Sequence, residues 1–418
     1  MLIMFKVKNY ASFKNEAVLD MRATSYIQHP SHEIPVDEKL CLLKTAAIFG
    51  ANASGKSNLI LAMDFFGQYI LSQLMNREKE NLLNSKQLKK KVIPFLLDSD
   101  VKKASEFEIT FLNNDKQFRY GFECDSDIVY SEWLFIDDKK VFERTGTKII
   151  FGRLYQKILG AYKTVPAERL YIAVLDYFLD REDKKVILDD FISFFTDAYT
   201  VFTETTFEAG NYDVCDQWLC FDEIAENQVL KRQVEKCLQL LDTGISRIEV
   251  ETKDRINVHT GRTKKVYLLS IVHNVYDDNG NVTGEKILGM NHESTGVIRF
   301  IVYIQNTVRM ILNGGVLVID EMSARLHHMA EKLMTDIFCS NQNKKAQLIF
   351  TTNDVSLLNN NQFRRDEVVF IEKNRRGESK LYALSDLKVR EDATFGKDYL
   401  QGKYGAVPDI DFKKMKKI

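Results

Sequence analysis

The sequence predicts an α/β fold in which a largely parallel sheet is covered by helices. The apolar run Thr45–Phe49 predicts a buried strand, and a glycine-rich loop connects it to apolar residues at helical spacing over 59–70. In the last third of the chain, three helical patterns alternate with apolar strands at 315–320, 346–351 and 368–372. Such alternation is typical of a parallel sheet flanked by helices.

The glycine-rich loop, residues 50–57, reads GANASGKS and fits the phosphate-binding pattern G-x-x-x-x-G-K-[ST]. Its context supports the match, because a strand precedes it and a helix follows it. Glycines let backbone N–H groups surround phosphate oxygens, and the following helix directs its positive end at the same anion. Lys56 would reach the β- and γ-phosphates of a nucleotide, and the Ser57 hydroxyl would bind Mg²⁺. The expected phosphate-binding residues are Gly50, Asn52, Ser54, Gly55, Lys56, Ser57 and Asn58.

A second motif supplies the acidic groups that the loop lacks. Residues 316–321 read VLVIDE, an apolar strand that ends in Asp320 and Glu321. Asp320 is suited to hold Mg²⁺, and Glu321 to polarise a water molecule. A glycine-rich turn or an acidic strand end is common by itself, but the two together, in this order and context, predict a nucleotide site. Far more than the roughly 30 residues of one βαβ unit separate the two motifs, so a large insertion lies between them.

The composition is that of a large globular chain with balanced charge. Its 418 residues are 45% hydrophobic, which is enough for a sizeable core and favours two domains. The 58 basic and 59 acidic residues give no overall electrostatic footprint for nucleic acid or an anionic membrane, although a local basic surface is compatible with these totals. The N-terminus lacks the features of a signal peptide, and no segment has the roughly 18–20 apolar residues of a membrane span. We therefore expect a cytoplasmic protein that makes no membrane contact and has reduced cysteines.

Three regions are expected along the chain. Residues 1–153 hold an N-terminal antiparallel β layer and the phosphate-binding loop, with a hairpin turn at 113–116. Residues 154–241 have helical periodicity and are expected to form an inserted helical lobe or arm. Residues 242–418 return to strands, with a hairpin turn at 277–280, and then enter the helix–strand alternation that carries the second motif.

A Ser-x-Gly sequence precedes the second motif. Ser294 and Gly296 stand at the start of an apolar helical pattern, and Gly314 is expected to end that helix. A hydroxyl group and free N–H groups at a helix start suit an anion. The same residues also fit an ordinary helix cap, and it is the spacing to Asp320 that favours the anion-binding role.

These motifs together resemble the ABC-type ATPases, in the branch that contains chromosome-maintenance and RecF-like proteins. The chain is most similar to the OLD-like (overcoming-lysogenisation-defect) AAA_15/AAA_21 group of stand-alone ATPase subunits from bacterial antiphage and abortive-infection systems, similar to the ATPase partners of the AbiL/RloA and PARIS types. Besides the loop (Walker A) and the acidic strand end (Walker B), the resemblance rests on four segments. These are KNYASF at 8–13, the reduced ABC signature STG at 294–296, a D-loop-like SARLH at 323–327, and the tail YLQGKYGAVP at 399–408.

The resemblance implies a P-loop NTPase fold of ABC type with ATP and Mg²⁺ as cofactors, and ATP hydrolysis that uses Lys56 and Glu321. In this group two subunits enclose two nucleotides, so Ser294 and Gly296 would contact the γ-phosphate bound by the partner. The chain would then form a homodimer or a higher homo-oligomer. It would act as the sensor or regulatory subunit for a separate effector, a TOPRIM or other nuclease.

Two residues depart from the family pattern. Asn353 stands where the family usually has a histidine that senses the γ-phosphate. Asparagine can still hydrogen-bond an oxygen but carries no positive charge, so hydrolysis is expected to be slow and the protein to act as an ATP-bound switch. Ala11 replaces an arginine that is often found there, so one phosphate-side contact is expected to be absent.

Two other functions stay open at the level of sequence. A DNA-repair or chromosome-maintenance ATPase would bind DNA directly, but the chain shows no sustained heptads and no net basic charge. A self-contained toxin nuclease in the middle lobe would cleave nucleic acid as the purified chain alone, without a partner. Several relatives of the group carry a TOPRIM nuclease in the same chain, which needs a Glu and a D-x-D that bind metal. The pair Asp409 and Asp411 is interpreted as part of a solvated tail, and His327 and His328 as surface residues at a helix start.

Overall fold

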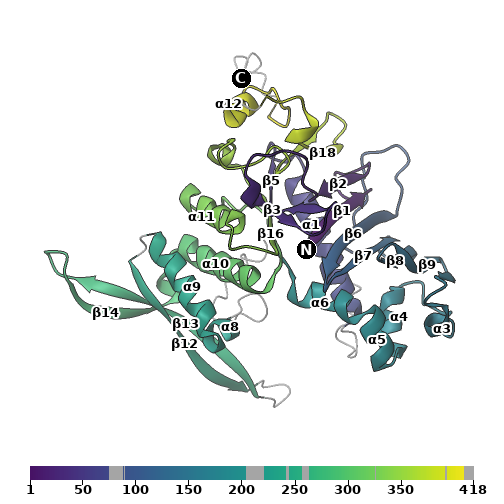
Figure 1. The fold of residues 1–418 in the computed structure, drawn as a ribbon, viewed down its shortest axis with the longest axis horizontal. Coiled ribbons are helices and arrows are strands. Elements are labelled where there is room, and N and C mark those ends of the chain that lie inside the picture. Colours follow the sequence, from purple (N-terminus) through teal and green to yellow (C-terminus); the bar gives the residue numbers. More distant parts are fainter. Residues whose placement is uncertain are drawn as a thin grey trace.

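The computed structural model describes residues 1–74, 88, 90–203, 221–241, 244–256, 263–324, 326–390 and 393–408. Arg325, which belongs to the D-loop-like segment, and the tail residues Asp409 and Asp411 lie outside these ranges. Two sheets face each other across one long helix, and a third sheet extends away from them (Figure 1). Of the helices in the described ranges, none combines the length and the apolar composition that crossing a bilayer requires.

The central sheet confirms the parallel arrangement that the sequence predicts. Its strand order is β11-β15-β16-β5-β17-β18, in which the first five strands are parallel and β18 runs antiparallel to β17. Strands β5, β15 and β16 are buried along their whole length, which explains why their sequences are mainly apolar rather than alternating. The six strands are β5 (Thr45–Phe49), β11 (Tyr199–Phe202), β15 (Gly315–Ile319), β16 (Ala346–Thr351), β17 (Val368–Lys373) and β18 (Ser379–Ala383).

A seven-stranded antiparallel sheet, in the order β10-β9-β8-β7-β6-β1-β2, forms the N-terminal layer. Helix α1 (Lys56–Leu74) lies between this layer and the central sheet and buries side chains on nearly all its faces. Phe66 of α1 stacks on Phe122 with ring centroids 5.1 Å apart, so the helix that begins at Lys56 is held by a packed layer. The seven strands are β1 (Leu2–Lys8), β2 (Ala17–Asp20), β6 (Ser105–Asn113), β7 (Lys116–Cys124), β8 (Val129–Ile136), β9 (Lys139–Thr145) and β10 (Lys148–Phe151).

Helices α10 (Thr295–Asn313) and α11 (His328–Cys339) belong to a second hydrophobic core, which lies on the opposite face of the central sheet. The sequence also predicts a third helix, between β16 and β17. This prediction is wrong, because residues 352–367 contain only the three-residue 3-10 helix η3 (Val355–Leu357). Polar side chains compete for the backbone there: Asn359 Nδ2 donates to the Ser356 carbonyl at 3.0 Å.

Residues 154–241 are expected to form one inserted lobe, but the described residues of this range, 154–203 and 221–241, are divided between the two cores. The first four helices of this region add side chains to the core around α1, and α6 also contacts α1 and β6. Strand β11 then joins the central sheet beside β15, and the last two helices pack against β12, β13 and α10. The helices are α3 (Gln156–Leu159), α4 (Tyr171–Phe178), α5 (Arg181–Ile187), α6 (Asp189–Asp197), α8 (Phe221–Glu226) and α9 (Gln228–Leu240).

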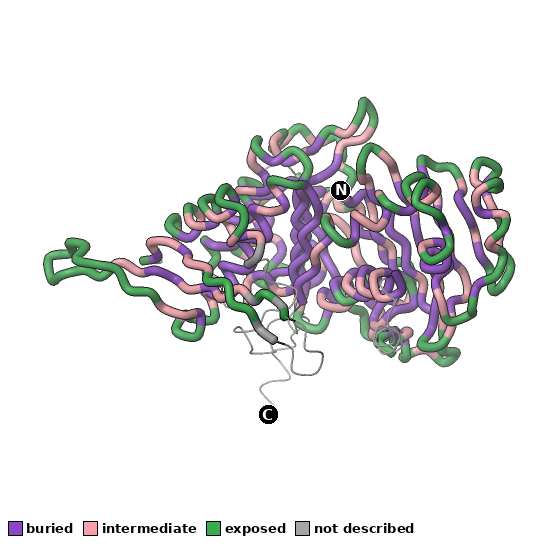
Figure 2. The backbone as a smooth tube through the Cα atoms, turned by 90° about the horizontal axis from the view of Figure 1, so that it is seen from below, coloured by how far each residue is buried: buried purple, intermediate pink, exposed green. Residues whose placement is uncertain are grey.

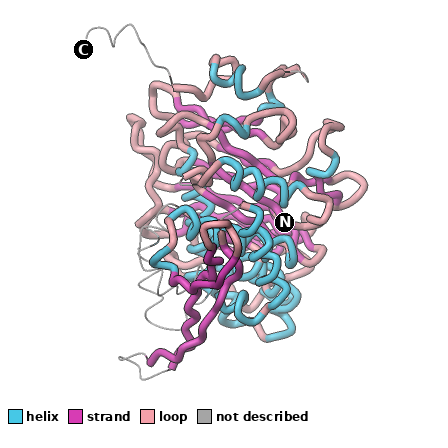
Figure 3. Tube along the Cα trace, turned by 90° about the vertical axis from the view of Figure 1, so that its left-hand side faces the viewer, coloured by secondary structure: helices cyan, strands magenta, loops and turns pink. Residues whose placement is uncertain are grey.

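The projection seen at the left of Figure 1 is a three-stranded antiparallel sheet of β12 (Ile245–Ile256), β13 (Thr263–Tyr276) and β14 (Val282–Gly289). Figure 3 shows its strands extending beyond the helices. The predicted turn at 277–280 is confirmed, and Asp277 Oδ1 accepts hydrogen bonds from the N–H groups of Asn279 and Asn281 at 2.9 and 2.8 Å. The projection is exposed at its outer end and buried at its base, whereas the central strands are the most buried part of the molecule (Figure 2).

The remaining elements are short. They are β3 (Glu33–Pro35), β4 (Cys41–Leu43), η1 (Pro30–His32), η2 (Met290–His292), η4 (Leu384–Asp386) and α12 (Phe395–Leu400). Two of them, β3 and β4, pair as a separate two-stranded antiparallel sheet.

Candidate functional site

The loop at 50–57 begins directly after β5 and ends in the first turn of α1. Gly55 has a φ of +116°, and a Cβ there would lie 2.5 Å from Ser379 Oγ and 2.7 Å from Ser12 Oγ. A Cβ at Gly50 would lie 2.4 Å from the Ile371 carbonyl oxygen. Glycine is therefore required at both positions, at Gly55 by backbone conformation and at both by close packing.

Serine hydroxyl groups hold the loop in place from outside. Ser379 Oγ, at the start of β18, donates to the Ser54 carbonyl at 2.6 Å and lies 2.7 Å from Ser12 Oγ. Ser12 Oγ in turn accepts from Asn58 Nδ2 at 2.7 Å. This network joins β18, the N-terminal segment and α1 around the loop, and it gives Asn58 a bracing contact that its place in the motif did not predict.

The loop contains polar groups that suit an anion. Ser54 Oγ is buried and has no hydrogen-bond partner among the described residues. Lys56 is also buried, and its Nζ donates to two carbonyls of the loop at 2.8 and 3.2 Å. Burial lowers the pKa of Lys56, whereas the charges of Glu321 and Asp320 raise it. A phosphate group would supply an anionic partner for the ammonium group and an acceptor for the hydroxyl, so these residues fit a nucleotide.

Asp320 and Glu321 follow β15, which lies two strands away from β5 in the same parallel sheet. The carboxyl ends of parallel strands meet at one edge, which brings the acidic pair toward the loop. Thr351, at the end of the intervening strand β16, joins the two acidic residues: its Oγ1 donates to Asp320 Oδ1 at 2.7 Å and accepts from the Glu321 N–H at 2.7 Å. Glu321 has a φ of +49°, in the left-handed region that is uncommon for residues other than glycine. The chain therefore turns sharply directly after Asp320.

Asn353 follows β16 and so stands at the same edge of the sheet as the loop and the acidic pair. Its side chain is exposed, and its backbone N–H donates to Ser323 Oγ at 3.4 Å. Asn353, which is expected to sense the γ-phosphate, therefore follows β16, the strand that lies between β5 and β15. Its hydrogen bond to Ser323 links it to the segment after Glu321.

Ser294 and Gly296 lie in a different part of the surface. Ser294 is the N-cap of α10, where its Oγ accepts from the Val297 N–H at 3.2 Å, and its side chain is exposed. Both residues line a largely apolar groove of about 690 Å³ between the ends of α9, α10 and α11, and none of its lining residues in the described chain comes from the loop at 50–57. Within one chain, therefore, the groove beside the signature sequence is separate from the phosphate-binding loop.

The two neighbouring histidines begin helix α11. His327 is its N-cap, and Nδ1 accepts from the Met329 N–H at 3.3 Å. Both His327 and His328 are exposed, and their rings lie 4.3 Å apart. Their interpretation as surface residues at a helix start is confirmed.

Several residues of the site were not predicted. Thr351 and Ser379 are single hydroxyl residues with no surrounding motif, so only the pairing of distant strands reveals them. The tail contact was also missed: the Ala51 N–H donates to the carbonyl of Ala406 at 2.8 Å. The sequence signal for this contact is the tail segment at 399–408, one of the segments on which the expected resemblance rests.

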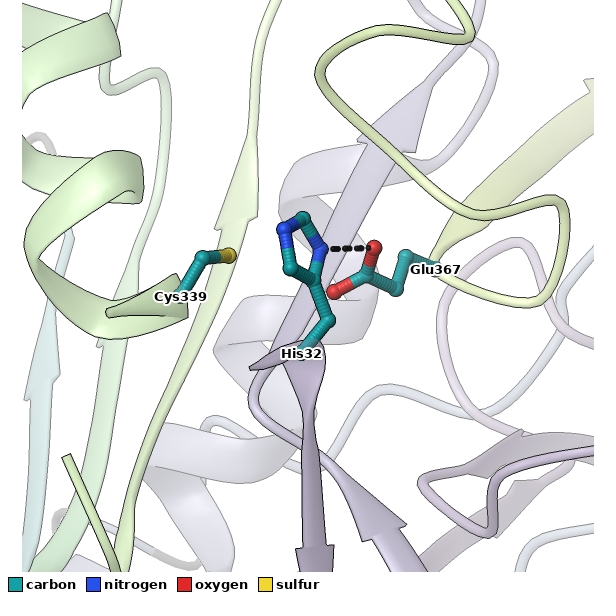
Figure 4. A group of neighbouring side chains, drawn as sticks. All are labelled: His32, Cys339 and Glu367. Carbon is teal, nitrogen blue, oxygen red and sulfur yellow. Dashed lines mark hydrogen bonds and ion pairs between the residues drawn. The ribbon is translucent and has the colours of Figure 1, made fainter. Parts of the chain in front are cut away.

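A buried cluster outside the loop contains His32, Cys339 and Glu367, whose nitrogen, sulfur and oxygen atoms lie within 4.8 Å of one another (Figure 4). Glu367 Oε2 lies 2.8 Å from His32 Nδ1 and accepts from the Arg364 N–H at 2.8 Å, and Oε1 accepts from Thr45 Oγ1 at 2.5 Å. Because protein donors already occupy both carboxylate oxygens, we describe the cluster as a hydrogen-bond network that ties η1 to β5 and β17.

Solved structures similar to this chain are head domains of chromosome-maintenance (SMC) proteins. The SmcHead bound to the C-winged helix domain of ScpA has 14% identity, covers 91% of this chain and 97% of its own, and has a TM-score of 0.49. The SMC head domain from Thermotoga maritima has 12% identity, coverage of 93% and 99%, and a TM-score of 0.41. The Smc head domain with an extended coiled coil, bound to the C-terminal domain of ScpA derived from Pyrococcus furiosus, has 11% identity, coverage of 96% and 98%, and a TM-score of 0.42.

No curated protein matches the chain. A family profile does: AAA_21, an AAA domain of the AbiEii-toxin, type IV toxin–antitoxin kind, matches residues 46–359. This range is more than half of the chain and includes the loop at 50–57, the Ser-x-Gly sequence and the acidic pair. The parallel sheet, with the loop after β5 and the acidic pair after β15, is the P-loop NTPase fold of ABC type. The protein therefore belongs to the AAA_21 family of ABC-type P-loop ATPases.

Proposed function

We propose that this protein is an ATP-dependent switch that binds and slowly hydrolyses ATP between two copies of itself and so controls a separate effector in bacterial antiviral defence. The observation that carries the ATPase part is the position of Asp320 and Glu321 after β15, at the same edge of the parallel sheet as the loop after β5. That loop holds the buried Lys56 and a buried Ser54 hydroxyl with no hydrogen-bond partner among the described residues. A cation and two carboxylates around an anion-ready loop are the parts that phosphoryl transfer needs.

Each residue of the site has a distinct role in this proposal. Lys56 would exchange its two backbone carbonyl partners for phosphate oxygens. Ser57 and Asp320 would hold Mg²⁺, which when bound neutralises phosphate charge. Glu321 would orient the attacking water and accept its proton. Asn353 would hydrogen-bond the terminal phosphate without adding positive charge, and this supports slow turnover.

Ser294 and Gly296 would act on the nucleotide of a second copy. The exposed position of Ser294, and the groove it shares with Gly296 and the start of α11, support this role, because a residue that contacts a partner's nucleotide must be accessible. A nucleotide-sandwich homodimer, or a higher oligomer built from it, would bring each Ser-x-Gly sequence to the loop of the partner.

The defence role rests on the family. The matching profile carries the description of a toxin–antitoxin system, and the short motifs resemble the OLD-like antiphage group. Several relatives in that group carry a TOPRIM nuclease in the same chain, and we propose a TOPRIM or other nuclease as a separate partner here. The cytoplasm is the compartment in which such a system would act.

The proposed switch predicts that ATP with Mg²⁺ assembles a defined oligomer and that Glu321→Gln traps it, because ATP binding is kept while the water-activating carboxylate is lost. Size-exclusion chromatography with light scattering, with and without ATP–Mg²⁺, measures this directly. Lys56→Ala is the matched control and should stay in its nucleotide-free form. A Glu321→Gln protein whose mass does not change with ATP contradicts the switch.

The same samples separate the other functions that the sequence left open. Incubation with DNA and RNA should yield no cleavage, because the effector is a separate protein. Cleavage by the purified chain would replace this proposal with a self-contained nuclease. ATP-dependent retention of DNA would replace it with a DNA-binding maintenance ATPase.

A further inference from the structure

Glu331 is a buried acidic residue that the proposed chemistry does not use. It lies in α11, three residues after the first residue of that helix, and its side chain is 1% exposed. Its Oε2 accepts a hydrogen bond from Thr352 Oγ1 at 3.2 Å. Burying a carboxyl group costs free energy unless it is hydrogen-bonded and either neutral or paired with an opposite charge, so this contact calls for a physical explanation.

The hydroxyl group of Thr352 connects Glu331 to the segment that carries Asn353. Thr352 Oγ1 donates to Glu331 and accepts from the Asp354 N–H at 3.0 Å. The two bonds span Asn353, so they fix the backbone on both sides of it. Thr351 braces the acidic pair in the same way, and the two consecutive threonines at the end of β16 therefore support neighbouring parts of one site.

The surroundings of Glu331 disfavour its ionised form. Helix α11 packs against α10, β5, β16, η1 and η3. The charged or titratable side chains on these elements and at the start of η3 are Arg299, Tyr303 and Arg309 on α10, His32 on η1, and Asp354. Arg299 donates to the Ala324 carbonyl, Arg309 to Thr200 Oγ1, and His32 bonds to Glu367.

On α11 itself, the other titratable side chains are His328, Lys332, Asp336 and Cys339. Lys332 pairs with Asp336 at 2.6 Å. Desolvation and the charge of Asp354 raise the pKa of Glu331 to about 8. Glu331 is therefore largely protonated at neutral pH.

We propose that Glu331 is a positioning residue that holds Asn353 at the nucleotide site through the hydroxyl group of Thr352. Ionisation of Glu331 would place a second negative charge beside Asp354 and push the Thr352–Asp354 segment out of place. This inference rests on the proposed ATPase activity. Glu331 touches no reacting atom in it and acts only through the position of Asn353.

The expected pH dependence follows from the direction of the shift. Because the protonated form is the competent one, kcat should be highest below pH 8 and fall as the pH rises through the pKa of about 8. At one unit above that pKa, roughly a tenth of the protein is still protonated, so kcat should fall about tenfold between pH 7 and pH 9. Glu331→Gln keeps a neutral acceptor for Thr352 and should change less than about twofold over the same range.

Two substitutions of Thr352 test, at fixed pH and in the full chain, the hydrogen-bond relay from Glu331 through Thr352 to the Asp354 N–H. Thr352→Val removes the hydroxyl group at nearly constant volume and should lower kcat by about tenfold to a hundredfold with little change in KM for ATP, because both hydrogen bonds of the hydroxyl group are lost. Thr352→Ser keeps the hydroxyl group and should retain activity within about twofold. Equal activities of the Val and Ser variants, or the same pH profile in the wild type and Glu331→Gln, would overturn the proposal.

A readout that needs no hydrolysis separates this inference from the proposed function. Hydrogen exchange of the Asp354 amide, followed by mass spectrometry of the peptide that spans 346–358, should accelerate in Thr352→Val but not in Thr352→Ser. In the wild type it should accelerate above pH 8 beyond the ordinary increase with pH, and in Glu331→Gln it should not. If exchange behaves this way and no ATP is hydrolysed, the ATPase assignment fails while the relay stands. Unchanged exchange in every variant refutes the relay itself.

Discussion

Thr351 connects the two acidic residues of the candidate site through one hydroxyl group. Its Oγ1 donates to Asp320 and accepts from the Glu321 N–H, both at 2.7 Å, in a fully buried position. Glu321 needs such support because its backbone occupies the left-handed region, a conformation that the surrounding structure must hold in place. Asp320 and Glu321 were predicted from their motif, whereas Thr351 has no motif and became visible only when β15 and β16 were paired.

Thr351→Val tests this support at nearly constant volume. Loss of the two bonds should lower kcat by about tenfold to a hundredfold and reduce the free energy of unfolding by about 1–3 kcal/mol, with ATP affinity changed much less. Steady-state hydrolysis and urea unfolding measure the two effects. Thr110→Val is the control, because the Thr110 hydroxyl is buried with no hydrogen-bond partner in the described chain. If both variants behave alike, Thr351 has no special role.

At the scale of elements, the sequence predicts those strands and turns that a local residue pattern determines. The apolar runs at Thr45–Phe49 and 315–320 predict β5 and β15 closely, and polar turn residues predict the hairpins at 113–116 and 277–280. The expected helix after β16 fails because asparagine side chains bond the local backbone. Periodicity alone also leaves open where a helix packs, since an amphipathic face fits any apolar surface. The sequence pattern over 154–241 therefore predicts one helical region, although the described helices of this range pack into two separate cores.

The contact between the C-terminal tail and the loop at 50–57 is another feature that local sequence pattern does not predict, and it can be tested by substitution. Its Ala406 carbonyl accepts from the Ala51 N–H, and Gly405, at a φ of +73°, has room for no side chain because a Cβ would lie 2.8 Å from Tyr382 Oη. Gly405→Ala should therefore displace the tail from the loop. We expect it to lower the free energy of unfolding by about 1–3 kcal/mol and to weaken ATP binding severalfold.

Urea unfolding and fluorescent-nucleotide titration measure the effects of Gly405→Ala. The matched control is Gly284→Ala on β14, where a Cβ would meet no atom within 4 Å. If the two variants bind nucleotide equally well, the tail does not support the loop.

At the scale of the whole molecule, the two faces of the central sheet carry different parts of the candidate site. The N-terminal layer and α1 hold the phosphate-binding loop from one face of the central sheet, whereas α10 and α11 on the other face carry the Ser-x-Gly sequence and the segment with Glu331 (Figure 1). The groove beside Ser294 includes no residue of the loop within the described chain, which agrees with the proposed site built from two copies.

Mixing two inactive variants tests this central claim most directly. Lys56→Ala disables the loop of its own chain, and Ser294→Arg disables the contact offered to a partner. Each protein alone should be inactive. In a mixed dimer, however, the intact loop of one chain meets the intact Ser294 of the other, so one of the two sites is restored. If the two chains pair at random in an equal mixture, half of the dimers are mixed, and hydrolysis should recover to about a quarter of the wild-type rate. If Ser294 instead served the loop of its own chain, every site would carry one defect and the mixture would stay inactive, which would contradict the account.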